Sequence, residues 1–212
     1  WMIEAEYQQP DMASKSIEKK TKIHRLTSTR RSVFDAFAYI NRLPEVPYKD
    51  ESPEDFSGRI FGRLANQEGR ILLKAPPGMS PLAYEGFKTF LRYEGDTNVG
   101  NCAACHTFPD FIDGRSHRVS PGMAKVPTTT LRNLHKTPQV VREIITQKMN
   151  HSHRKQNGNT SEMSDAYSIM QISPADVSSL IAFIKLLQDV PEQQFRQLIL
   201  NAKLFDPAGE YK

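Results

Sequence analysis

Both cysteines of the 212-residue chain lie in one short motif, Cys102-Ala103-Ala104-Cys105-His106. Two cysteines three positions apart, followed at once by a histidine, form the attachment motif for c-type haem. In that chemistry each thiol adds to one haem vinyl group, and the short turn delivers the adjacent imidazole to the iron as the proximal ligand. The motif predicts one covalent haem c, held by Cys102 and Cys105, with His106 bound to the iron.

Other uses of the cysteine pair explain less of the motif. A redox Cys-x-x-Cys needs no histidine, and it usually sits on a thioredoxin-like βαβ unit that this sequence does not suggest. A zinc site needs a fourth ligand, which His151 or His153 could supply. A disulfide between the two cysteines would leave His106 without a role.

Composition predicts a small helical protein with many chain breaks. Hydrophobic residues make up 38% of the chain, charged residues 25%, and there are 14 prolines and 11 glycines. We expect one domain, or one domain with long extensions, in which short helices are joined by irregular segments. No apolar run approaches the length of a membrane span, so we expect no transmembrane segment.

Proline positions indicate where helices begin. Four segments open with a hydroxyl residue before a proline, at Ser52-Pro53, Ser80-Pro81, Thr137-Pro138 and Ser173-Pro174. The hydroxyl caps the first free N–H groups, and proline suits the first helical position because it lacks an N–H. Apolar residues at helical spacing follow each pair, and similar stripes occupy 32–43 and the segment after Pro191. No alternating strand pattern is present, so the predicted fold is all-α, with a long loop over 107–136 wrapping the haem edge.

The N-terminal region carries much of the net charge of +4. Between positions 15 and 31 there are seven Lys and Arg residues against one Glu. The run is either a solvated arm or a docking patch for an acidic partner protein. Nucleic acid is a poorer fit, because no aromatic residue is interleaved with the run and no recognition motif follows it.

The second axial position on the iron has several candidate ligands. The methionine candidates are Met149, Met163 and Met170, and the histidine candidates are His117, His135, His151 and His153. Arg132 is a candidate partner for a haem propionate, because a guanidinium pairs well with a partly buried carboxylate.

Several motifs together resemble the C-terminal haem half of bacterial di-haem cytochrome c peroxidases and of the related enzyme that matures tryptophan tryptophylquinone. In chain order they are SVFDAFAYINRLPEVPY, SPLAYEGFKTFLRY, CAACHTFPDFIDGRSHRVS, VPTTTLRNL and ISPADVSSLIAFIKLL. The resemblance covers about residues 33–187. It implies a cytochrome c-like haem domain over 32–190, preceded by a basic arm over 1–31 and followed by a C-terminal helix and tail over 191–212.

The resemblance also implies roles for individual residues. His106 would be the proximal ligand, Arg132 would face the haem propionates, and His117 would lie near the haem. The distal ligand would come at or just past the end of the helix after the Leu-Arg-Asn motif. Met149 fits that description best because it ends the helix that we expect from Pro138, and Met163 and Met170 are the alternatives.

The expected function is electron transfer by a mono-haem c-type cytochrome, alone or as part of a larger redox enzyme, with a redox partner protein. The alternative is a peroxidase-type enzyme that reduces hydrogen peroxide at an open iron site or with a second haem. The family's second Cys-x-x-Cys-His has no counterpart in these 212 residues, so that haem would come from another chain. Haem attachment predicts a periplasmic or otherwise extracytoplasmic location. Because WMIEAEYQQP lacks the apolar core of a secretory signal, we expect that a signal peptide has been removed.

Overall fold

The structure is a computed structural model of the whole chain. It describes residues 30–68, 73–91, 102–118, 124–134, 138–155 and 172–205. The chain divides into two units, Trp1–Arg30 and Arg31–Lys212, and every element below belongs to the second unit. Most of the basic arm expected over 1–31 lies outside the described residues.

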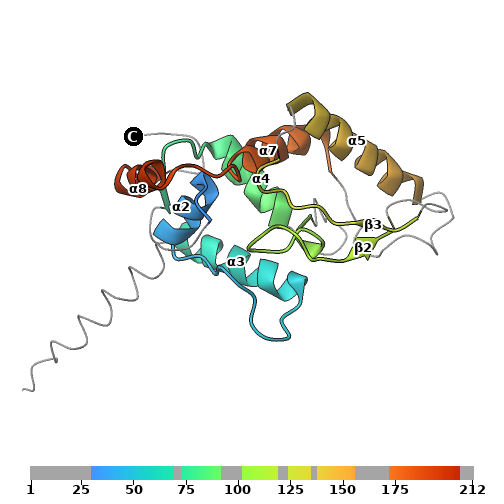
Figure 1. Cartoon of the computed structure of the whole chain (residues 1–212), viewed down its shortest axis with the longest axis horizontal. Helices are drawn as coiled ribbons and strands as arrows, with labels where there is room; N and C mark the ends of the chain where they lie inside the picture. Colours follow the sequence, from blue (N-terminus) through green and yellow to red (C-terminus); the bar gives the residue numbers. More distant parts are fainter. Residues whose placement is uncertain are drawn as a thin grey trace, which may run out of the picture. The chain divides into compact units, whose positions relative to one another are not determined.

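Helices form most of the described structure (Figure 1). They are α2 (Val33–Ile40), α3 (Pro53–Glu68), α4 (Pro81–Leu91), α5 (Pro138–Lys155), α7 (Pro174–Lys185), α8 (Glu192–Leu200) and a 3₁₀ turn, η2 (Cys102–Ala104). The four prolines expected to open helices each do so, and those predictions are confirmed. None of the described helices is long and apolar enough to cross a membrane.

Side-chain caps explain why α2 and α7 begin where they do. Ser32 accepts a hydrogen bond from the backbone N–H of Asp35, and the Asp35 carboxylate accepts one from the backbone N–H of Ser32. Ser173 and Asp176 form the same reciprocal pair at the start of α7. Each pair satisfies two N–H groups that have no partner within the helix.

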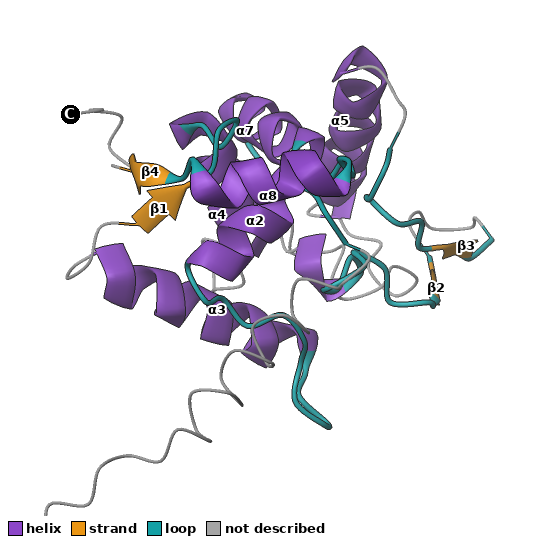
Figure 2. Ribbon diagram, turned by 60° about the vertical axis from the view of Figure 1, so that its left-hand side comes forward, coloured by secondary structure: helices purple, strands orange, loops and turns teal. Residues whose placement is uncertain are grey.

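Four short strands add a feature that the sequence analysis did not predict. β1 (Leu73–Ala75) pairs antiparallel with β4 (Lys203–Phe205), and β2 (Ser116–His117) pairs antiparallel with β3 (Val126–Pro127). The two sheets lie on opposite sides of the helices in Figure 2. Strands of two or three residues are too short to produce a detectable alternation, which explains the difference from the expectation.

Among the described helices, α4 and α7 pack closely against each other. A Cβ atom placed on Gly86 of α4 would overlap the backbone carbonyl of Ser179 in α7. Gly86 is therefore required by the close approach of the two helices.

A cluster of phenylalanines connects the helices to the segment after the cysteine motif. It consists of Phe34, Phe87, Phe90, Phe108, Phe111 and Phe183, all buried. Neighbouring rings lie edge-on or tilted, for example with 4.9 Å between the centroids of Phe34 and Phe87 and 4.7 Å between those of Phe108 and Phe111. Such aromatic pairs add stabilisation beyond their buried area. The core thus anchors residues 108–111 directly behind the cysteine turn.

Candidate haem-attachment site

The cysteine motif forms a tight turn that packs against α3 and α4. The backbone N–H groups of Cys105 and His106 both donate to the carbonyl of Cys102, at 3.3 and 2.9 Å. Ala103 is buried, and both cysteines are half-buried thiols that form no disulfide. The turn therefore presents two thiols and an imidazole within five consecutive residues, which are the groups that would attach a c-type haem and bind its iron.

The imidazole of His106 is oriented by the backbone. Its Nδ1 lies 3.1 Å from the carbonyl oxygen of Phe111. A carbonyl only accepts hydrogen bonds, so Nδ1 donates in this contact, and in the neutral imidazole the lone pair is then on Nε2. Histidines that bind metals are commonly held in this way by a second interaction at the other ring nitrogen. His106 is thus in the tautomer that an iron ligand through Nε2 needs.

Phe111 holds this carbonyl in an unusual conformation. Its φ angle is +55°, in the left-handed region, and its ring is fully buried in the phenylalanine cluster. A bulky residue with positive φ is an outlier that the surrounding structure must hold in place. The buried ring and the reversed backbone together turn the Phe111 carbonyl toward His106.

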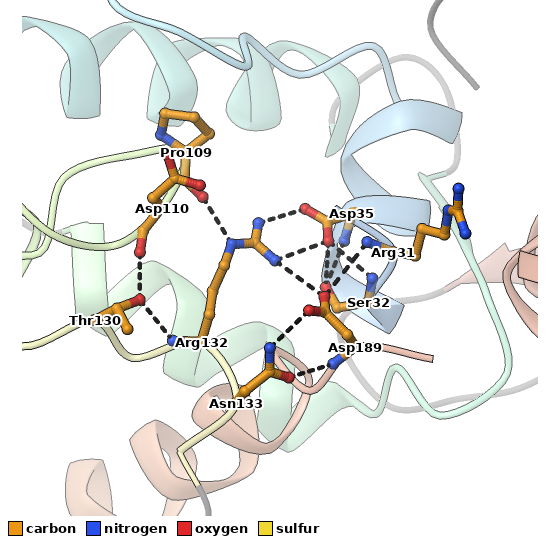
Figure 3. Close-up of polar contacts among 9 residues, drawn as sticks. All are labelled: Arg31, Ser32, Asp35, Pro109, Asp110, Thr130, Arg132, Asn133 and Asp189. Atoms are coloured by element: carbon orange, nitrogen blue, oxygen red, sulfur yellow. Dashed lines mark hydrogen bonds and ion pairs between the residues drawn. The ribbon is translucent and has the colours of Figure 1, made fainter. Parts of the chain in front are cut away.

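Arg132 lies at the centre of a polar network (Figure 3). Two of its N–H groups donate to the two carboxylate oxygens of Asp35, at 2.9 and 2.6 Å, and its Nε donates to the carbonyl of Pro109 at 3.0 Å. Its side chain is 9% exposed and that of Asp35 is 17% exposed. The structure therefore gives Arg132 a carboxylate partner within the protein, and its pairing with a haem propionate stays a prediction.

The same network ties the segment after α7 to the start of α2. The side chain of Asn133 exchanges two hydrogen bonds with Asp189, at 2.6 and 2.8 Å. The backbone N–H of Val190 donates to the carbonyl of Arg31 at 2.7 Å. Asn133 also adopts a positive φ of 52°, which asparagine tolerates.

His117 lies beside the cysteine motif, paired with an acid. Its Nε2 is 2.6 Å from a carboxylate oxygen of Asp113, four residues earlier. One ligand atom each from Cys105, Asp113 and His117 lie within 4.8 Å of one another. The structure thus brings His117 close to one of the two thiols, and its place next to a haem stays a prediction.

The carboxylate of Asp113 is held in its charged form. Burial raises its pKa, but the backbone N–H of Arg115 and the side chains around it oppose that effect. These side chains are those of His117 and Thr128, which both hydrogen-bond to the carboxylate. The net result is a pKa of Asp113 below its usual value.

Among the candidates for the distal ligand, His117 is the one that the described residues place near the cysteine motif. Met163, Met170 and His135 lie outside the described residues, and so do the side chains of His151 and His153. Met149 lies within α5, and its side chain is also outside the described part. The expectation that Met149 ends this helix is wrong, because α5 continues to Lys155 through the polar residues Asn150 to Arg154.

A separate apolar groove of about 250 Å³ lies between α5 and α7. Val141, Ile181 and Ile184 form part of its wall, together with Leu134. None of its lining residues belongs to the cysteine turn, so we assign it no part in holding the cofactor.

Three functional candidates were missed from the sequence. Asp113 could have been found from its spacing of four residues before His117, although such spacing is common. Asp35 could have been recognised as a cap from its spacing after Ser32, but its pairing with Arg132 spans 97 positions and leaves no local signal. Thr130, which donates to the carbonyl of Asp110 at 2.6 Å, has none either.

Comparisons with known proteins add no relative. No model of a known protein family, no curated protein and no solved structure matches this chain.

Proposed function

We propose that the protein is a c-type cytochrome that carries one covalent haem on Cys102 and Cys105, with His106 as an axial ligand. The observation that carries the proposal is the hydrogen bond from Nδ1 of His106 to the Phe111 carbonyl, next to two reduced thiols at haem-attachment spacing. This arrangement supports iron ligation through Nε2. The bound haem would supply the one-electron chemistry.

The protein's own residues would set the conditions for that chemistry. His106 would supply a ligand of fixed tautomer, and the phenylalanines behind the turn would keep one side of the site dry. Axial ligation, hydrogen bonds near the iron and burial all influence the reduction potential of a haem. We propose a methionine as the distal ligand: Met149 is the first candidate because it lies in the helix after the Leu-Arg-Asn motif, and Met163 and Met170 are the alternatives.

The biological context follows from the same proposal. Haem attachment of this type favours a periplasmic protein, and the basic run over 15–31 favours an acidic redox partner. The resemblance to the di-haem peroxidases favours a role beside a second haem on another chain. Added salt should slow reduction by an acidic partner, because it screens the attraction between exposed charges.

A second candidate rests on the cluster of Cys105, Asp113 and His117. A thiolate, a carboxylate and an imidazole with mutually close ligand atoms are suitable ligands for zinc. In this arrangement Cys105 would bind a metal ion directly and could not form a thioether at the same time. Both proposals use the Cys105 sulfur, so they cannot both be correct.

One experiment separates them. The chain is produced in cells that attach haem c and in cells that do not, and each product is assayed for haem and metal. The cytochrome proposal requires one haem per chain in the first product, identified by its pyridine haemochrome spectrum. This haem must stay attached to the protein after denaturation and extraction with acidified organic solvent. Extractable haem, or one zinc ion per chain without haem, would refute it.

A further inference from the structure

The turn behind His106 is held by hydrogen bonds in an unusual way. The carbonyls of four consecutive residues, 109 to 112, each accept a hydrogen bond from a different side chain. The pairs are Pro109 with Nε of Arg132 at 3.0 Å, Asp110 with the Thr130 hydroxyl at 2.6 Å, Phe111 with Nδ1 of His106 at 3.1 Å, and Ile112 with the Thr107 hydroxyl at 2.9 Å.

Two of the four donors come from a distant segment of the chain. Thr130 and Arg132 lie about twenty positions after the carbonyls that they hold. They are also fixed to each other, because the backbone N–H of Arg132 donates to the Thr130 hydroxyl at 3.1 Å. Arg132 can reach Pro109 with Nε while its two terminal nitrogens hold Asp35, since a guanidinium offers donors along two edges.

We propose that Thr130 and Arg132 are positioning residues for the axial histidine. By fixing the carbonyls of residues 109 and 110, they hold Phe111 in its left-handed conformation and aim its carbonyl at Nδ1 of His106. Asp35 anchors Arg132 in this role. The inference rests on the proposed function, and it gives Arg132 a task that is independent of any haem propionate.

The expected consequence concerns the strength of the bond at Nδ1. A hydrogen bond donated by Nδ1 makes Nε2 a more basic ligand, which favours ferric over ferrous iron and lowers the reduction potential. We call the hydrogen bonds from Thr130 and Arg132 to the carbonyls of residues 110 and 109 the clamp. Weakening the clamp should therefore raise the reduction potential. It should also expose the Nδ1 proton to solvent more often.

The first test needs no cofactor. Solvent exchange of the His106 Nδ1 proton is followed by NMR in the full-length chain. If the chain carries haem, the measurement is made on the reduced protein. Thr130→Val should speed this exchange about fivefold, the factor that corresponds to the net value of one hydrogen bond. Thr130→Ser keeps the hydroxyl and should match the wild type, as should Thr129→Val at the exposed neighbouring position.

The second test uses Arg132→Lys, which keeps the charge but cannot hold a carboxylate and a carbonyl in the same geometry. We expect faster exchange at His106 and a raised reduction potential. The matched control is Glu51→Gln, which weakens another bidentate arginine–carboxylate pair, that of Glu51 with Arg59. It should lower stability without moving either readout.

Two results would overturn the inference: unchanged exchange in both Thr130→Val and Arg132→Lys, or equal changes in Arg132→Lys and Glu51→Gln, which would indicate general loosening. A chain without haem would instead refute the proposed function. The exchange measurement would still test the turn in that case.

Discussion

Replacing Arg132 by Gln should cost about 3 kcal/mol of folding free energy, because the change leaves a half-buried carboxylate without its cation. The side chain of Arg132 is 9% exposed and that of Asp35 is 17% exposed, so water can only partly replace the lost contacts. Two charge-assisted hydrogen bonds and one to the Pro109 carbonyl are removed together. For a domain of this size the loss corresponds to a decrease in Tm of about 6–12 °C.

The assay is urea unfolding followed by far-ultraviolet circular dichroism, carried out as a double-mutant cycle. Arg132→Gln, Asp35→Asn and the double variant are compared with the wild type at neutral pH. We expect a coupling energy of about 2 kcal/mol, since the two side chains are in direct contact. Arg63→Gln, at an exposed position on α3, should change stability by less than about 0.5 kcal/mol.

Two outcomes would refute this reasoning. One is a coupling energy below about 0.5 kcal/mol, which would mean that the two side chains contribute independently. The other is equal and small effects of Arg132→Gln and Arg63→Gln. The slope of the unfolding free energy against urea must stay constant, because a changed slope would indicate a change in the unfolded state.

Three further predictions follow from other parts of the structure. Gly86→Ala should destabilise the protein by at least about 1–3 kcal/mol, since the added methyl group meets the α7 backbone; Gly58→Ala, which meets no atom within 4 Å, should instead stabilise it by about 0.5–1 kcal/mol in the same urea assay. The hydrogen bond from Arg59 lowers the pKa of Glu51. The Glu51–Arg59 pair therefore stabilises the fold at pH values above the ordinary glutamate pKa of 4.5, and this contribution is lost as the pH falls below that value. The stability difference between wild type and Glu51→Gln should therefore shrink over that acid range, and a constant difference would contradict the prediction. Met149→Ala should abolish the near-infrared methionine–iron band and lower the reduction potential, whereas the same effect from Met163→Ala alone would identify Met163 as the ligand.

The helix starts could be predicted from the sequence because their causes are local. A hydroxyl residue followed by proline satisfies the first N–H groups of a helix and fixes the first φ angle, whatever the rest of the chain does. The end of α5 could not be predicted in the same way. Its last residues are polar, so no apolar stripe marks them, and the helix continues six residues past Met149.

In the candidate site, too, the local part could be predicted from the sequence and the long-range contacts could not. The turn from Cys102 to His106 could be predicted because five consecutive residues define it. The clamp on the next turn could not, since Thr130 reaches back twenty positions and Asp35 meets Arg132 across 97. Arg132 was singled out for its chemistry, but only the fold reveals the carboxylate that it holds.

The link between Asp189 and the start of α2 has a consequence for the order of events during synthesis. Arg31 and Asp189 are 158 positions apart, yet their backbone and side-chain atoms meet, and Asp35 beside them anchors Arg132. A nascent chain cannot complete this connection until nearly the whole domain has left the ribosome, and contacts of such long range form slowly. Both thiols of the cysteine turn will have emerged long before then. In the proposed function haem would be attached after export, and on the far side of the membrane the two thiols would again arrive before Asp189.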